Sequence, residues 1–87
     1  MQPDEIRSQL LALLTTIAPD IEPQSVDPER NFRDQFDFDS MDALHFVQGV
    51  SEAFGIDIAE ADYPQLASLN GALALVRARL PVKTAGA

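Results

Sequence analysis

The sequence predicts a small all-α protein: a bundle of three main helices and one short helix, with a long loop between helices one and two. Three segments repeat apolar residues at helical spacing, and no stretch alternates apolar and polar residues as a half-buried strand would. Hydrophobic residues make up 46% of the chain, enough for a packed core. At 87 residues we expect one domain over 1–81 and a flexible tail over 82–87.

The first helix is predicted from Pro3 to Ala18. Proline is favoured in a first turn, and Asp4 and Glu5 lie where the helix dipole favours negative charge. Pro19 marks its end. One buried stripe is expected to contain Ile6, Leu10, Leu13, Leu14 and Ile17.

Residues 19–39 contain three prolines and many acids, and their apolar residues follow no sustained helical or strand period. This pattern predicts a long loop. Loops of this length are uncommon in small domains and often have a function. We expect this one to be ordered, because it contains the apolar anchors Ile21, Val26, Phe32, Phe36 and Phe38.

The second main helix is predicted to begin at Asp39 or Ser40 and to end near Phe54, where Gly55 provides a left-handed stop. On a helical wheel, one broad arc forms the expected core face: Leu44, Phe46, Val47, Val50 and Phe54. A different, exposed arc holds Met41, His45, Gln48 and Glu52.

The remaining chain predicts an extended connection, a short helical turn near residues 60–66, and a last helix capped by Ser68. Pro81 is expected to end that helix. Its apolar stripe is predicted to contain Leu69, Leu73, Val76 and Leu80.

Charge and residue content exclude several functions. The chain has 14 acidic and 6 basic side chains, a net charge of −8, which disfavours nucleic acid and anionic lipid and favours basic partners. It has no cysteine and one histidine, so we expect neither a metal site nor catalytic residues. No apolar run is long enough to span a membrane and no signal peptide is recognisable, so a soluble, cytoplasmic protein without membrane insertion is expected.

Ser40 lies between acids in the stretch FDFDSMD and has two interpretations. Serine is a common helix cap, but the third residue after it is Ala43 and not the Glu or Gln of a capping box. Asp39 can supply the cap instead, which would leave the Ser40 hydroxyl in the first turn. A phosphate ester there would meet unpaired helix amides, although the nearby aspartates oppose it. The residues alone permit both a structural and a modified serine.

The segment DFDSMDALHFVQGVSEAFGIDI resembles the centre of the acyl carrier protein family, in which Asp-Ser-Leu-Asp/Glu opens the second helix. The order of helices and loop extends the resemblance over nearly the whole chain. It implies a carrier that is not an enzyme, with 4'-phosphopantetheine on Ser40 transferred from coenzyme A by a phosphopantetheinyl transferase. Acyl groups would then travel as thioesters on the arm's thiol.

The resemblance also implies a docking surface and an acyl pocket. Acyl ligases, synthases or acyltransferases with basic patches would contact Asp39, Met41, Asp42, His45, Gln48 and Glu52. A fatty acyl cargo would lodge among Leu44, Phe46, Val47 and Phe54.

Three positions depart from the family pattern: His45 replaces a typical Glu, Gln48 a typical Met or other apolar residue, and Asp37 a frequent Gly. We expect a free-standing, monomeric carrier, and the changes at His45 and Gln48 favour a specialised lipid or secondary-metabolite pathway over standard fatty acid synthesis. An aminoacyl, peptidyl or polyketide carrier is an alternative. An unmodified acidic module that binds proteins through its second helix is another.

Overall fold

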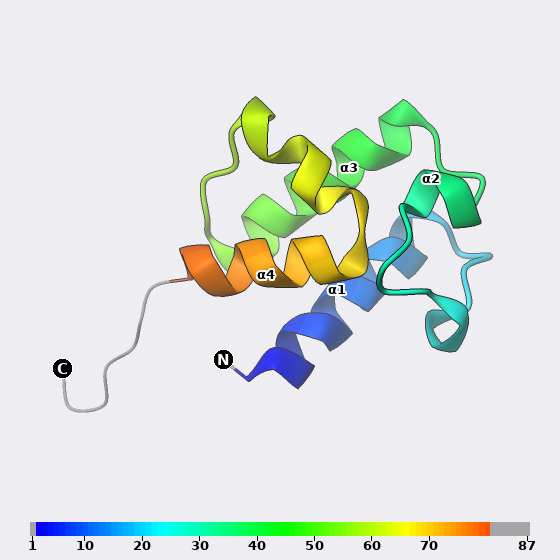
Figure 1. Cartoon of the computed structure of the whole chain (residues 1–87), viewed down its shortest axis with the longest axis horizontal. Helices are drawn as coiled ribbons and strands as arrows, with labels where there is room; N and C mark the ends of the chain where they lie inside the picture. Colours follow the sequence, from blue (N-terminus) through cyan, green and yellow to red (C-terminus); the bar gives the residue numbers. More distant parts are fainter. Residues whose placement is uncertain (1, 81–87) are drawn as a thin grey trace, which may run out of the picture.

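The computed structural model describes residues 2–80, and within this range all the regular secondary structure is helical, as predicted (Figure 1). The expectations for Pro81 and for the tail at 82–87 lie outside the described residues. The elements are α1 (Pro3–Ile17), η1 (Pro23–Ser25), α2 (Phe32–Gln35), α3 (Ser40–Phe54), η2 (Glu60–Ala67) and α4 (Leu69–Arg79), where η denotes a 3-10 helix.

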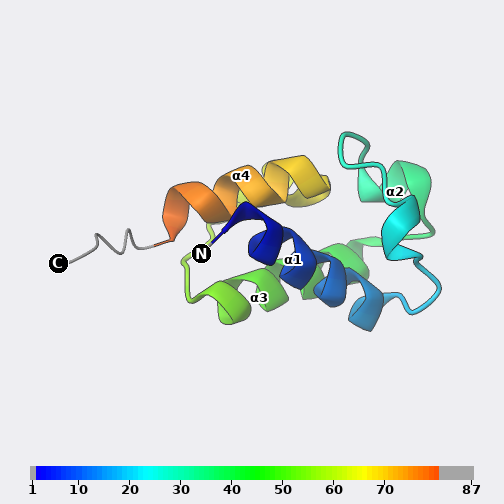
Figure 2. The ribbon, with the colours of Figure 1, turned by 90° about the horizontal axis from the view of Figure 1, so that it is seen from below.

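Helix α1 packs against both α3 and α4, and η2 packs on α4 and α3 (Figures 1 and 2). The predicted stripe of α1 is mostly correct, since Ile6, Leu10 and Leu14 are buried while Leu13 and Ile17 are half-buried. No helix in the described part of the chain has the length and apolar character needed to cross a bilayer.

The end of α3 matches the prediction. Gly55 adopts the left-handed conformation with φ 63° and ψ 39°, and its N–H donates to the Ser51 carbonyl. The Ser51 hydroxyl in turn donates to the Ile56 carbonyl over 2.7 Å. These bonds satisfy polar groups that the helix end would otherwise leave unpaired.

The loop after α1 is ordered, as predicted, but it is more helical than its sequence indicated. It contains η1 and α2, which are too short to show a helical period. The Gln35 amide stabilises it: its nitrogen donates to the carbonyls of Asp27 at 2.8 Å and Arg30 at 2.9 Å. Its oxygen accepts from the Asp27 N–H at 2.8 Å. One side chain thereby pairs three backbone groups that a loop would otherwise leave to water.

Helix α4 begins as predicted, with the Ser68 hydroxyl oxygen accepting from the Gly71 N–H at 3.1 Å. A Cβ at Gly71 would overlap the carbonyl oxygen of Gln65, so the close approach of η2 to α4 requires glycine at this position. The predicted stripe is only partly buried. Leu69 and Val76 are buried, Leu73 and Leu80 are half-buried, and the core also takes Ala72 and Leu75.

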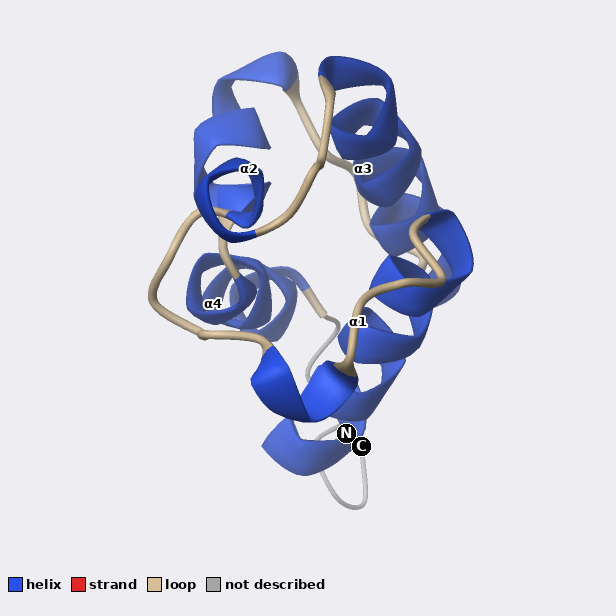
Figure 3. Ribbon diagram, turned by 90° about the vertical axis from the view of Figure 1, so that its right-hand side faces the viewer, coloured by secondary structure: helices blue, strands red, loops and turns tan. Residues whose placement is uncertain are grey.

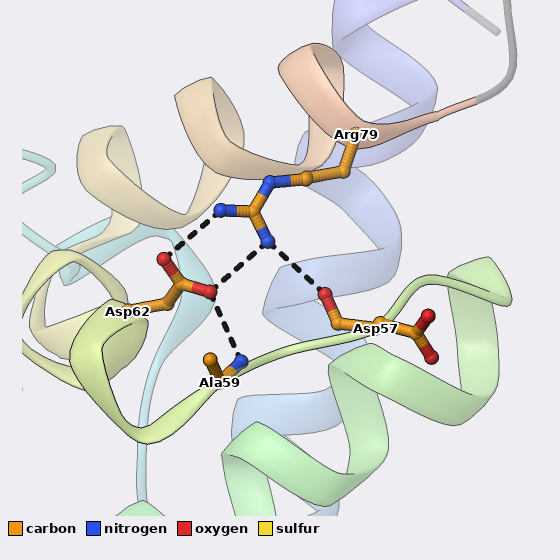
Figure 4. A network of polar contacts seen from close by, with 4 residues as sticks. All are labelled: Asp57, Ala59, Asp62 and Arg79. Carbon is orange, nitrogen blue, oxygen red and sulfur yellow. Dashed lines mark hydrogen bonds and ion pairs between the residues drawn. The ribbon is translucent and has the colours of Figure 1, made fainter.

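Arg79 joins the end of α4 to η2 and to the connection that precedes η2 (Figure 4). Its guanidinium donates to both carboxylate oxygens of Asp62, at 2.9 and 3.0 Å, and to the Asp57 carbonyl at 3.1 Å. The Asp62 carboxylate also accepts from the Ala59 N–H at 3.0 Å. The hydrogen bond from Arg79, followed by that from Ala59, lowers the pKa of Asp62 below its ordinary value of 3.8.

This pKa predicts how stability depends on pH. A carboxyl whose folded pKa is lowered stabilises the protein above its unfolded pKa, and the effect is lost as pH falls through the folded pKa. We therefore expect Asp62→Asn to lower the melting temperature slightly at pH 7, and the difference from wild type to disappear in acid. Asp57→Asn is the matched control, because only the carbonyl of Asp57 joins the network. An equal loss in both variants at pH 7 would contradict this role.

Candidate functional site

Ser40 is the first residue of α3 and is exposed beside an apolar cavity of about 340 Å³. The cavity lies between α3, η2, α2 and the chain that joins α2 to α3. Figure 1 shows α2 and the start of α3 at the same end of the molecule, and Figure 3 views the molecule from that end. The cavity lining consists of Phe32, Arg33, Phe38, Ser40, Ala43, Leu44, Phe46, Val47, Tyr63, Leu66 and Ala67.

The helix cap at this site is supplied by Asp39, as the sequence permitted. Its Oδ1 accepts from the Asp42 N–H at 2.8 Å, and the Asp39 N–H donates to Asp42 Oδ2 at 3.2 Å. These reciprocal bonds form a capping box that was not predicted, because aspartate here takes the position that usually holds Glu or Gln. Within residues 2–80 the Ser40 hydroxyl has no hydrogen-bond partner, so capping does not occupy it.

Aromatic contacts fix the chain that leads into Ser40. The Phe32 ring meets the Phe46 ring edge-on at a centroid distance of 5.3 Å and the Phe38 ring at 5.6 Å. All three rings are buried, whereas Phe36 is half-buried. Because Phe38 precedes Ser40 by two residues, its burial holds the serine at the edge of the cavity.

The residues predicted for the acyl pocket separate into two groups. Leu44, Phe46 and Val47 line the cavity, whereas Phe54 is buried in the core away from it. Leu44 is 38% exposed, so the prediction that it lies on the core face is wrong. A helical wheel gives the direction of a side chain but not which neighbour covers it.

The other wall of the cavity comes from η2 and was not predicted. Tyr63, Leu66 and Ala67 line this side. The apolar residues of this turn were visible in the sequence, but their position opposite α3 depends on tertiary packing.

The predicted docking residues on α3 lie at the surface. Met41 is 59% exposed, and His45, Gln48 and Glu52 are exposed too. Gln48 and Glu52 border a shallow groove that Tyr63 also lines. Asp39 is exposed and Asp42 half-buried, and both are already engaged in the capping box. Contact with partners stays a prediction for all six residues.

Comparison with known proteins identifies the family of this chain. A family model described as "Phosphopantetheine attachment site" matches residues 8–76. The chain is also 26% identical over 70 residues to proteins named "Acyl carrier protein" from Thermosynechococcus vestitus and from Rubrobacter xylanophilus. Each alignment covers 77% of this chain and 86% of the relative.

The chain belongs to the phosphopantetheine attachment site family, which confirms the resemblance found in the sequence. It is a carrier protein and not an enzyme, and its family implies a covalent 4'-phosphopantetheine. Family membership likewise implies modification by a phosphopantetheinyl transferase and interaction with biosynthetic enzymes.

The residues around Ser40 fit this group. The serine hydroxyl is exposed and uncommitted, and an apolar cavity opens beside it. First-turn amides of a helix favour an anion such as a phosphodiester. When bound, the arm supplies a thiol to a chain that has no cysteine. In the described chain no three acids or histidines gather as a metal site would require.

The capping box makes a prediction about stability. Asp39→Ala removes the acceptor for the Asp42 N–H and is expected to lower the free energy of unfolding by about 1 kcal/mol. Asp39→Asn keeps an acceptor oxygen and should cost much less. Asp37→Ala is the control, since Asp37 is exposed and makes no hydrogen bond within the described residues. Denaturant unfolding measures all three, and equal losses for the two alanine variants would contradict the role of the cap.

Proposed function

We propose that Ser40 is the attachment serine and that the protein carries acyl intermediates as thioesters on its 4'-phosphopantetheine arm. The observation that supports this most directly is the uncommitted hydroxyl at the start of α3. Asp39 and Asp42 cap the helix, so the serine is not needed for capping. An exposed residue at the end of a rigid helix is also accessible to a transferase and then to partner enzymes.

The physical contribution of such a carrier is a tether. Once the protein docks on an enzyme, the arm raises the local concentration of the acyl group at that active site. The chemistry on the acyl group is left to the partner enzymes.

The exposed residues of α3 are the proposed docking surface. Met41 offers an apolar contact close to Ser40, while His45 and Gln48 offer hydrogen-bonding groups and Glu52 a charge. Charged contacts of this kind affect association rate and orientation more than affinity. The replacement of an acid by His45 supports partners other than the standard fatty acid enzymes, in a specialised lipid or secondary-metabolite pathway.

The cavity beside Ser40 is the proposed site for an apolar cargo. Its lining is mostly aliphatic and aromatic, and burying an acyl chain there contributes about 0.8 kcal/mol per methylene group. Phe32, Phe38 and Phe46 are held by mutual ring contacts, so the cavity has a rigid aromatic wall on this side.

Intact-mass measurement tests the attachment site. Incubation with coenzyme A and a broad-specificity phosphopantetheinyl transferase should add one phosphopantetheine to wild type and none to Ser40→Ala. Ser51→Ala is the matched control on the same helix and should be modified fully. If the Ser40→Ala variant still gains the phosphopantetheine mass, the attachment site is a different residue. No gain in wild type would favour an unmodified interaction module.

Chemical shifts test the cargo site. Loading the arm with a medium-length saturated acyl group should shift the signals of cavity residues such as Val47 and Leu66, and not those of Leu10, which is buried in α1 outside the cavity. Ala67→Phe adds a ring to the cavity lining and should suppress these shifts without preventing arm attachment. Unchanged signals in acylated wild type would place the cargo outside the cavity.

A further inference from the structure

One charged side chain lines the cavity beside Ser40, that of Arg33 in α2. The other lining residues are apolar except for the hydroxyls of Ser40 and Tyr63. Nothing in the packing of α2 requires a cation here, because Phe32 anchors this turn in the core and Gln35 satisfies the loop backbone. Arg33 is exposed, so its guanidinium can also be reached from solvent.

The charge of Arg33 is not matched within residues 2–80. The ion pair in this part of the chain joins Arg79 to Asp62, and Arg30 donates to the Asp34 carbonyl. The Arg33 guanidinium has neither an ion-pair nor a hydrogen-bond partner among the described residues. Its donors are therefore available to a group that the protein chain does not contain.

The first-turn amides of α3 favour an anion at Ser40, but the nearby acidic side chains oppose one. Asp37, Asp39 and Asp42 lie within three residues of the serine, and the whole chain has a net charge of −8. A phosphodiester on Ser40 would add a further negative charge to this cluster. Like charges at short range repel, so a cation beside the attachment point offsets part of that repulsion.

We propose that Arg33 binds the phosphodiester of the prosthetic arm and positions the start of the arm at the mouth of the cavity. This inference rests on the proposed attachment at Ser40. The ester bond fixes the phosphorus directly on the Ser40 oxygen, at the edge of the cavity that Arg33 also lines. A tethered anion has a high effective concentration at such a cation. A guanidinium fits phosphate oxygens through two parallel hydrogen bonds.

The apo and holo proteins provide the test. Intact mass first confirms that the arm is attached, and proton–nitrogen spectra then follow the guanidinium Nε–H signals. Attachment should shift the Arg33 signal and leave Arg30, in the same loop, and Arg77, in α4, unchanged. The shift should diminish at about 1 M salt, where the screening length is about 3 Å.

Two variants separate charge from geometry. Arg33→Gln and Arg33→Lys should both accept the arm and keep the far-ultraviolet circular dichroism of wild type, because Arg33 is exposed. The phosphorus-31 signal of holo Arg33→Gln should narrow relative to holo wild type as the arm gains mobility. Arg33→Lys, which keeps the charge without the planar fork, should fall between them.

Three outcomes would overturn the inference. If the mass gain occurs but the Arg33 signal stays unchanged, Arg33 does not bind the arm, although attachment at Ser40 stands. If the signal shifts only after a cargo with its own carboxylate is loaded, the bound anion belongs to the cargo and not to the arm. If no mass gain occurs, attachment itself fails.

Discussion

The burial of Phe32 is the contact on which the site depends. This residue belongs to the loop between α1 and α3, is 1% exposed, and meets the rings of both Phe38 and Phe46. Ordering a loop costs conformational entropy at every residue, so the loop needs a substantial anchor. Full burial of one phenylalanine contributes about 1.5–3 kcal/mol, before the geometry of aromatic pairs adds to it. Phe32 also contacts Phe38, so the same anchor supports the chain that leads to Ser40.

The opposite wall of the cavity depends on a different set of contacts. Helix η2 is a 3-10 helix, whose hydrogen-bond geometry is poorer than that of an α-helix, so its position relies on tertiary contacts. Arg79 holds it at one end through Asp62. Gly71 allows the close approach of η2 to α4. The cavity therefore lies between an aromatic wall fixed by the loop and a wall fixed by α4, and a change in either would alter its volume.

How much could be predicted differs between the fold and the site. The helical period located α1, α3 and α4, and Ser68 and Gly55 marked two of their ends, because these signals are local. Helix α2 was missed because its four residues complete only one turn. The sequence permitted an uncommitted hydroxyl at Ser40, because Asp39 could supply the cap instead. The cavity lining was not, since the contributions of η2 and the exposure of Leu44 depend on which segments pack together.

The distribution of charge on α3 bears on the partners that the proposed docking surface would fit. Its acids lie at the two ends, Asp42 in the first turn and Glu52 near the last. The two acids are ten positions apart, which corresponds to about 15 Å along the helix axis at a rise of about 1.5 Å per residue. Between them the exposed stripe presents Gln48 and His45, neither of which is an acid. A partner that matches this face would need cationic groups spaced about 15 Å apart, by the same helical rise, with hydrogen-bonding groups between them. A uniformly basic patch would instead place positive charge where this stripe has no acid to pair with it. The choice of partner would then depend on the absence of acids at His45 and Gln48 as much as on the acids at Asp42 and Glu52.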